Sequence, residues 1–141
     1  MTKQKVRTFL WFNDKAAEAA GFYTSIFKNS RIQSQSPMIV EFELAGSQYI
    51  ALNGGPAFQF NEAISLSVDC ADQAEIDELW GKLSEGGSPG QCGWLKDRYG
   101  LSWQIVPAVL QELMSDPTKA SRVMAALMTM TKISIKELQN A

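Results

Sequence analysis

An internal repeat constrains the fold of this chain more than any other feature of its sequence. The first copy begins with the string LWFND at 10–14 and continues with a helical pattern and two strand-like runs; the second begins with LSVDC at 66–70 and continues in the same way. Repetition at an offset of about 56 residues indicates that one structural unit is duplicated. A unit of one strand, one helix and further strands cannot cover its own sheet well, so we expect two units to pack around a shared concave surface. The repeat therefore predicts a duplicated α+β architecture.

The first copy follows the periods of a strand, a helix and a hairpin. The β-branched and aromatic run 6–13 predicts a strand, and Asp14 is a candidate cap of the helix after it. The runs 38–44 and 48–52 predict the two strands of a hairpin. Spacings of three and four predict the helix face that packs on the sheet: Ala16, Ala20, Tyr23 and Phe27.

The second copy shows the same periods. Alternation of apolar and polar residues in 63–70 predicts a half-buried strand. Asp72 with Glu75 is typical of a capping box at the start of a helix, and the runs 92–95 and 101–106 predict another hairpin. The apolar face of the helix is expected to hold Ile76, Leu79, Trp80 and Leu83.

One domain is expected to span 1–141, with the first repeat at about 5–55, the second at about 62–107 and a helical tail at 108–141. Ser134 is a candidate cap of the last helix. The tail contains four of the six methionines: Met114, Met124, Met128 and Met130. Methionine suits adaptable contacts, so we expect the tail to pack on the body or on a dimer mate rather than to form a ligand-adaptive surface.

Histidine is absent from the 141 residues. Because histidine is the usual general base, nucleophile pairs of the serine–histidine and cysteine–histidine kinds are excluded. Cys70 and Cys92 have no histidine to activate a thiolate, and inert, buried or half-buried thiols are the preferred interpretation.

Charge and hydropathy limit the partners. The net charge of −2 provides no basic field, so neither DNA nor RNA is expected to bind. No apolar run reaches the roughly 20 residues that a membrane span needs. The start, MTKQKVRTFLWF, has only a short apolar stretch, unlike a signal peptide. We therefore expect a soluble, cytoplasmic protein with reduced cysteines.

Long strings of the sequence resemble one known family over nearly the whole chain. They are FLWFND with GFYTSIF, then ALNGGPAFQFNEAISLSVDC, and finally CGWLKDRYGLSWQIVP. With these strings the chain resembles the PhnB-like (demethylubiquinone methyltransferase-like) branch of the vicinal oxygen chelate superfamily. The resemblance implies duplicated βαβββ modules, the glyoxalase/bleomycin resistance/dioxygenase fold, with a C-terminal helical extension, and it implies a homodimer. It does not by itself imply methyl transfer.

The resemblance also implies positions for a divalent metal, held by His, Glu or Gln from the first and last strands of each half. Those positions hold Arg7, Ala63, Ile50 or Ala51, and Gln104. Only Gln104 is a possible donor, and Glu62 joins it only after a one-residue slip. Two donors do not offset the dehydration of a divalent cation. Glu41 and Glu43 are interpreted as solvent-facing carboxylates, so we expect no metal and no cofactor.

Methyl transfer from S-adenosylmethionine commonly requires a glycine-rich strand-to-helix turn in a parallel sheet. The glycine doublets at 54–55 and 86–87 lack the G-x-G spacing. The sequence therefore does not support methyl transfer of this common kind. The alternative hypothesis is still a superfamily enzyme, either metal-dependent or a methyltransferase as the family label (3-demethylubiquinone-9 3-methyltransferase-like) suggests. The sequence does not determine whether any reaction is catalysed.

Strand alternation, with the face assignment that the resemblance implies, predicts a ligand pocket. Its concave side is expected to hold Phe9, Trp11, Asn53, Ser65, Ser67, Ser102 and Gln104. The opposite side, toward the helices, is expected to hold Leu10, Phe12, Ile64, Leu66, Trp103 and Ile105. Trp94, also part of the predicted pocket, is with Phe58 and Phe60 a candidate to close it. This aromatic and small polar lining suits a small, partly apolar molecule, so we hypothesise a metal-free small-molecule binding protein.

Overall fold

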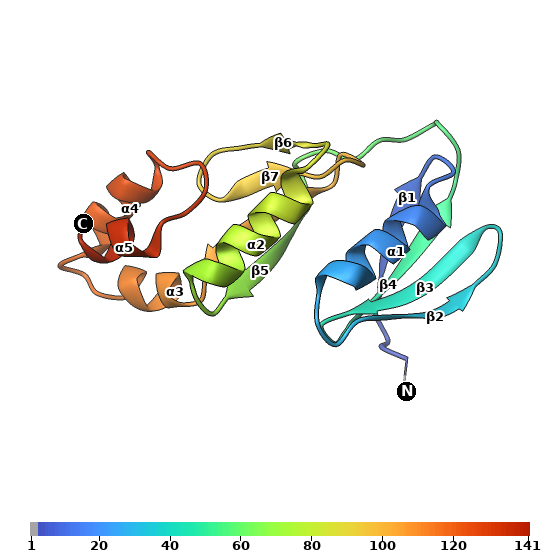
Figure 1. Cartoon of the computed structure of the whole chain (residues 1–141), viewed down its shortest axis with the longest axis horizontal. Coiled ribbons are helices and arrows are strands. Elements are labelled where there is room, and N and C mark those ends of the chain that lie inside the picture. Colours follow the sequence, from blue (N-terminus) through green and yellow to red (C-terminus); the bar gives the residue numbers. More distant parts are fainter. Residues whose placement is uncertain (1–2) are drawn as a thin grey trace. The chain divides into compact units, whose positions relative to one another are not determined.

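The computed structural model describes residues 3–141 (Figure 1). Its contacts divide the chain into two compact units that meet in sequence between Phe60 and Asn61. Each unit contains one strand, one helix and three further strands in that order, and the second unit continues into three short helices. The predicted duplication of a βαβββ module with a C-terminal helical extension is therefore confirmed. The expectations of one domain over 1–141 and of a shared concave surface stay predictions.

The first unit is a four-stranded sheet that carries one helix. Its elements are β1 (Thr8–Phe12), α1 (Ala16–Ile26), β2 (Arg31–Gln35), β3 (Ile39–Leu44) and β4 (Ser47–Asn53). In the spatial order β1-β4-β3-β2, β1 runs parallel to β4 and the other neighbours are antiparallel. Tyr23 of α1 is buried and stacks on Phe42 of β3, with ring centroids 6.3 Å apart. Burial of this apolar helix face is what holds α1 on the sheet.

The second unit repeats the arrangement. Its elements are β5 (Ser65–Cys70), α2 (Gln73–Ser84), β6 (Ser88–Pro89), β7 (Trp94–Lys96) and β8 (Ser102–Pro107). The spatial order is β5-β8-β7-β6, with β5 parallel to β8. Ile76, Leu79 and Leu83 of α2 are buried, as are Trp103 and Ile105 of β8. The parallel pairing of the first and last strands matches that of the first unit, and it leaves one face of each sheet to its helix.

Three short helices form the tail: α3 (Val109–Met114), α4 (Ala120–Leu127) and α5 (Ile135–Gln139). They bury a small apolar cluster of their own, made of Val123, Met130, Ile133 and Leu138. Met124 and Met128 are exposed. Within residues 3–141, no helix combines the length and the hydropathy that a membrane crossing needs.

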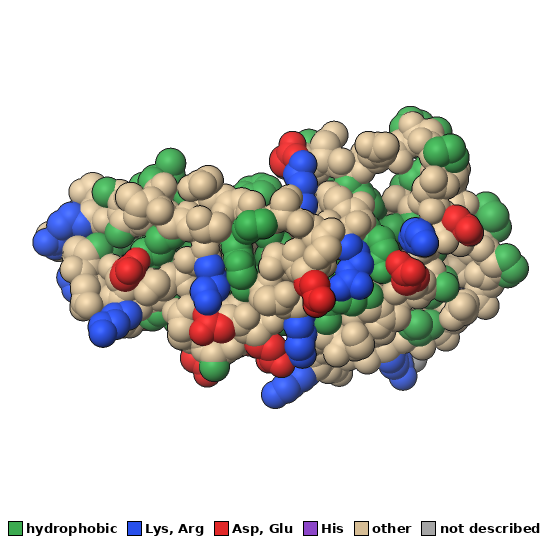
Figure 2. Space-filling view, turned by 45° about the horizontal axis from the view of Figure 1, so that its top comes forward, with side chains coloured by type: hydrophobic (Ala, Val, Ile, Leu, Met, Phe, Trp, Pro, Cys, Tyr) green, Lys and Arg blue, Asp and Glu red, His purple; other side chains and the backbone are tan. Residues whose placement is uncertain are grey.

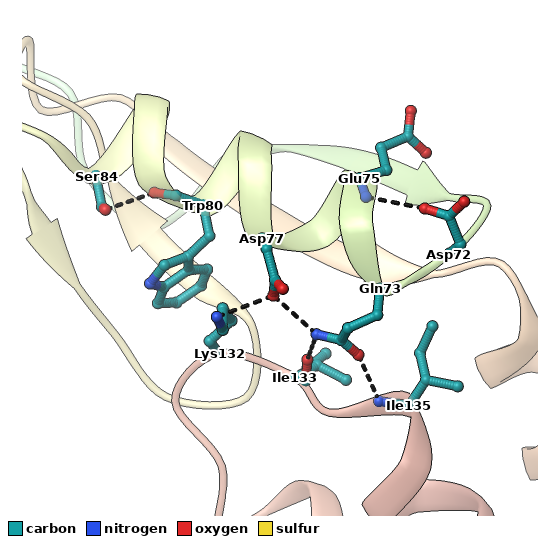
Figure 3. A network of polar contacts seen from close by, with 9 residues as sticks. All are labelled: Asp72, Gln73, Glu75, Asp77, Trp80, Ser84, Lys132, Ile133 and Ile135. Atoms are coloured by element: carbon teal, nitrogen blue, oxygen red, sulfur yellow. Dashed lines mark hydrogen bonds and ion pairs between the residues drawn. The ribbon is translucent and has the colours of Figure 1, made fainter.

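Gln73 at the start of α2 joins the helical tail to the rest of the second unit (Figure 3). Its side-chain Nε2 donates a hydrogen bond to the carbonyl oxygen of Ile133 at 3.0 Å, and its Oε1 accepts one from the N–H of Ile135 at 2.9 Å. Lys132 pairs with Asp77 of α2 at 2.9 Å, and this hydrogen bond lowers the pKa of Asp77. The tail therefore packs on the body of its own chain.

The predicted cap of α1 is wrong. Asp14 adopts a left-handed backbone, with φ of +62°, and the cap position falls on Lys15, whose side chain makes no capping hydrogen bond. Instead, Oδ1 of Asn53 accepts a hydrogen bond from the N–H of Ala16 at 2.9 Å. The cap comes from a neighbouring strand because the end of β4 lies beside the end of β1.

Several predicted element limits also differ from those observed. Ile64 is 55% exposed and precedes β5, because pairing with β8 begins at Ser65. Phe27 is the residue after α1 and is only half-buried. The sequence pattern did not single out β2, because four of its five residues are exposed and show no apolar alternation.

Two other predicted caps are confirmed. Asp72 accepts a hydrogen bond from the N–H of Glu75 at 2.9 Å, as Figure 3 shows. Ser134 accepts one from the N–H of Glu137 at 3.3 Å. Both caps join residues three positions apart, which is why the sequence alone predicts them.

Candidate functional site

The open face of the second sheet gathers five of the predicted pocket residues. On the paired strands β5 and β8, Ser65 lies opposite Ser102 and Ser67 lies opposite Gln104. Trp94 of β7 also lies opposite Gln104. Because directly paired residues point to the same side of a sheet, these five side chains share one face, and the buried side chains of the helix face lie on the other.

A pocket of about 220 Å³ is bounded by β6, β7 and the start of β8. Its lining includes Trp94 and Ser102 of the predicted set, together with Glu62, Ser88, Pro89 and Lys96. Ser65, Ser67 and Gln104 share the face but are not part of the lining. The structure therefore brings two of the eight predicted residues into one pocket.

Sequence reasoning missed the contribution of β6. This strand has only two residues, Ser88 and Pro89, which is too short for an alternating pattern. The sequence signal for this strand was Gly90, which directly follows it. The structure shows why glycine stands there, because a Cβ atom at Gly90 would lie 2.8 Å from the carbonyl oxygen of Trp94. The N–H of Gly90 donates a hydrogen bond to that carbonyl at 2.8 Å. The close approach that glycine allows forms one wall of the pocket.

The charges at the pocket are balanced. The ammonium group of Lys96 pairs with the carboxylate of Glu62, and the hydrogen bond from Lys96 lowers the pKa of Glu62. The pair adds no net charge to the pocket. On the face drawn in Figure 2, basic and acidic side chains are interspersed, and no large area carries one sign. That no nucleic acid binds stays a prediction.

The polar side chains of the open face differ in how they are satisfied. Nε2 of Gln104 donates a hydrogen bond to Oγ of Ser65 at 3.0 Å. Ser102 is only 1% exposed, and within residues 3–141 its hydroxyl oxygen is buried without a hydrogen-bond partner. A buried hydroxyl that lacks a partner costs about 1–3 kcal/mol. A ligand that reaches this group from the pocket would supply the missing hydrogen bond.

Two predicted aromatic residues lie on the first sheet. Phe9 is 56% exposed on the face opposite α1. Trp11 shares this face, but its Nε1 donates a hydrogen bond to the carbonyl oxygen of Gly55 at 2.9 Å, and its ring meets that of Phe58 edge-on at 4.9 Å. Trp11 therefore anchors the segment that follows β4.

Asn53 lies on the other face of the first sheet. It pairs with Phe12, its Oδ1 accepts from Ala16 and its Nδ2 donates to the carbonyl oxygen of Pro37 at 3.0 Å. Its predicted place on the pocket face is wrong, because the parallel register sets it opposite a residue that faces the helix. Phe60 also packs on Phe12, with ring centroids 5.4 Å apart.

The acidic side chains of the first sheet are engaged by arginines. Glu41 pairs with Arg7 at 3.7 Å, and Glu43 pairs with Arg31 at 3.6 Å. Glu43 is 5% exposed, so its interpretation as a solvent-facing carboxylate is wrong. Among residues 3–141, no three or more His, Cys, Asp or Glu side chains are grouped so that they would hold a metal ion. These donors, with Gln104 as the remaining candidate, do not fit the divalent metal that the superfamily implies.

Neither thiol has the surroundings of a catalytic nucleophile. Burial, together with the smaller effect of nearby carboxylates, first that of Glu75, raises the pKa of Cys70 to about 12. A thiol with so high a pKa has almost no thiolate at neutral pH. Cys92 is half-buried, and its Sγ lies 3.8 Å from Sδ of Met128.

The family of the chain follows from a match over most of its length. The sequence model of the 3-demethylubiquinone-9 3-methyltransferase family matches residues 4–106. The chain belongs to this PhnB-like family. The solved PhnB protein of Bacillus cereus, which carries the same family name, is 35% identical; the match covers 74% of this chain and 100% of that one, with a TM-score of 0.69. No curated protein matches the sequence.

Other solved structures resemble this PhnB-like protein in fold. Protein PA1353 of Pseudomonas aeruginosa is 21% identical, with 74% of this chain and 98% of that chain covered and a TM-score of 0.60. The fosfomycin resistance protein FosX of Listeria monocytogenes, solved with Mn(II) and sulfate, is 17% identical, with 82% of this chain and 98% of that chain covered and a TM-score of 0.61. At these identities the likeness concerns the fold alone, which is the glyoxalase/bleomycin resistance fold of the vicinal oxygen chelate superfamily.

Proposed function

We propose that this PhnB-like protein binds a small, partly apolar molecule, without a metal ion, on the open face of its second sheet. The observation that carries the proposal is the pocket of about 220 Å³ that Trp94, Pro89 and Ser102 line. Sites for small molecules combine apolar walls with a few polar groups that orient the ligand. The indole and the proline supply the apolar walls here, and the hydroxyl supplies a polar contact.

The volume of the pocket supports a small ligand. Pockets that hold drug-sized molecules have volumes of about 300–1,000 Å³. The pocket is smaller than that range, so a single ring with short substituents suits it. Ser65, Ser67 and Gln104 lie on the same face and would extend the contact of a longer ligand.

The pairing of the carboxylates supports binding without a metal. Glu62 is paired with Lys96, Glu41 with Arg7, and Glu43 with an arginine of β2. A divalent cation would have to displace a cationic side chain from each carboxylate that it used. The cation would also lose water ligands, and these side chains do not provide enough oxygen ligands to replace them.

We further propose that the protein acts as a cytoplasmic homodimer. The unpaired thiols of Cys70 and Cys92 support a reducing compartment. The exposed side chains of Met124 and Met128 on the tail support contact with a second copy, because methionine is common at adaptable interfaces.

Native mass spectrometry of the full chain, purified without a chelator or a histidine tag, tests these proposals. The expected spectrum shows a dimer with an organic adduct and no metal. The variant Trp94→Ala is expected to lose the adduct, whereas Trp80→Ala, which removes a half-buried indole from α2 outside the pocket, is expected to keep it.

The same spectrum distinguishes the alternatives. A stoichiometric divalent metal would contradict metal-free binding and support a metal-dependent enzyme. An adenosyl cofactor would support the methyltransferase alternative. An adduct that Trp94→Ala retains would contradict the assignment of the pocket, and a monomer mass would contradict the dimer.

A further inference from the structure

We infer that the ligand of this pocket is an uncharged molecule that forms a hydrogen bond with the hydroxyl group of Ser102. The inference rests on the proposed function and deepens it by naming the chemical class of the ligand. Two observations carry it: the unsatisfied hydroxyl in the pocket wall, and the neutralised ion pair beside it.

The polar groups nearest to Ser102 across the strands make their contacts elsewhere, and its hydroxyl has no partner among residues 3–141. Ser65 lies directly opposite it on one neighbouring strand, but the hydroxyl of Ser65 already accepts a hydrogen bond from Gln104. Lys96 lies directly opposite it on the other neighbouring strand, but the ammonium group of Lys96 is paired with Glu62. Within residues 3–141, neither of these cross-strand neighbours makes a hydrogen bond with the hydroxyl of Ser102.

A buried hydroxyl group is rarely left unsatisfied, because its hydrogen bond with water is lost on burial without replacement. Ser102 is 1% exposed and lines the pocket. A ligand that offers a hydroxyl or carbonyl oxygen restores the missing hydrogen bond. A hydrocarbon of the same shape leaves the hydroxyl unsatisfied and covers it further.

The ion pair favours an uncharged ligand. Lys96 and Glu62 both line the pocket and carry opposite charges that are already in contact. A charged ligand is attracted by one of them and repelled by the other, so its loss of hydration is poorly compensated. An uncharged ligand avoids this cost and keeps the apolar contact with Trp94 and Pro89.

Four probes of one size test the class: benzyl alcohol, toluene, benzoate and benzylammonium. NMR titration of the full chain, followed at the indole N–H of Trp94, gives the affinity of each. We expect benzyl alcohol to bind about three- to tenfold more tightly than toluene, since one neutral hydrogen bond separates them. Benzoate and benzylammonium are both expected to bind more weakly than benzyl alcohol.

The variant Ser102→Ala isolates the hydroxyl. It is expected to abolish the preference for benzyl alcohol over toluene, and at the same time to leave the urea midpoint of the ligand-free protein unchanged or higher, because no hydrogen bond within the protein is lost. A serine with a merely structural role would give the opposite result, a lower midpoint with an unchanged preference. Ser84→Ala, on α2 and outside the pocket, is expected to bind all four probes as the unchanged protein does.

Two further variants test the ion pair. Glu62→Gln leaves Lys96 unpaired and is expected to increase the affinity for benzoate relative to benzyl alcohol. Lys96→Gln leaves Glu62 unpaired and is expected to do the same for benzylammonium. If the unchanged protein already prefers benzoate or benzylammonium to benzyl alcohol, the ligand class is charged and the inference is overturned.

The outcomes separate the inference from the proposed function. If all four probes, toluene included, fail to shift the indole signal of Trp94, the proposed pocket is wrong and the inference falls with it. If the probes bind but benzyl alcohol and toluene bind equally in the unchanged protein, the pocket stands and the inference alone is overturned.

Discussion

The carboxylate of Asp97 accepts a hydrogen bond from the indole Nε1 of Trp103 at 2.9 Å, and both side chains are buried. The same carboxylate accepts hydrogen bonds from the backbone N–H groups of Tyr99 at 2.8 Å and Leu101 at 3.1 Å. One side chain thus organises the turn between β7 and β8. The register of these strands is what sets the two sides of the pocket opposite each other.

Removal of this carboxylate is expected to destabilise the protein. Asp97→Ala leaves three donors without their acceptor, so we expect the free energy of unfolding to fall by roughly 2–4 kcal/mol. Asp97→Asn keeps one acceptor oxygen and is expected to cost less. Urea unfolding measures both, with Asp69→Ala, an exposed carboxylate on β5, as a control expected to change stability by no more than about 0.5 kcal/mol. An Asp97→Ala protein as stable as this control would contradict the proposed role of the carboxylate.

Two glycine-to-alanine substitutions in the first unit are expected to have opposite effects. A Cβ atom at Gly54 would lie 2.3 Å from the indole ring of Trp11, so Gly54→Ala is expected to destabilise by about 1–3 kcal/mol. Gly21 lies within α1 with nothing near its Cβ position, so Gly21→Ala is expected to stabilise by about 0.5–1 kcal/mol. Thermal or urea unfolding checks the signs, and a stable Gly54→Ala protein would show that Trp11 moves easily.

The side chain of Gln73 is expected to hold the tail on the second unit. Gln73→Ala removes the hydrogen-bond partners of the backbone groups of Ile133 and Ile135. We therefore expect the free energy of unfolding to fall by about 1–3 kcal/mol. We also expect hydrogen exchange to accelerate more in the tail than in the first unit, relative to the unchanged protein. Lys132→Ala removes an exposed ion pair and is expected to cost less than about 1 kcal/mol. Equal effects of the two substitutions would count against the buried contacts as the main attachment.

The two thiols are expected to differ in reactivity at pH 8. Cys70 is fully buried, and burial raises its pKa to about 12, whereas Cys92 is half-buried. A thiol-specific disulfide reagent should therefore modify Cys92 first in the folded protein. The Cys92→Ser variant is expected to react only after unfolding in urea, and rapid modification of that variant would contradict the burial of Cys70.

Stability is expected to fall at alkaline pH. The pKa of Cys70 is raised from 9.0 to about 12 on folding, so ionisation of this thiol favours the unfolded chain. The contribution of the neutral thiol is fully present below about pH 9 and is lost as the pH rises from there toward 12. Burial also raises the pKa of Tyr49, which adds to the same trend. Urea unfolding at several pH values checks this, and Cys70→Ala is expected to reduce the slope; an unchanged slope would rule out Cys70 as its source.

Local features of the fold could be predicted because they depend on residues near one another in the chain. The helix caps at Asp72 and Ser134 join residues three apart, and the buried faces of α1 and α2 follow spacings of three and four. The duplication could be predicted because the same series of patterns occurs twice. The strands β2 and β6 were missed because one is mostly exposed and the other has two residues.

The candidate site could be predicted only in part, because alternation assigns a face but not a partner. It correctly assigned Ser65, Ser67, Ser102 and Gln104 to one face. It failed for Asn53, whose side chain faces α1 because the parallel register with β1 decides its side.

By itself, the sequence determined the longer strands and helices, the duplicated module and the family to which the chain belongs. Only the tertiary structure decided that Glu62 neutralises Lys96, that Asn53 caps α1 and that the hydroxyl of Ser102 is buried without a partner. The physical reason is that each of these depends on groups brought together from distant parts of the chain, and a one-residue change of strand register would exchange every side chain between the two faces.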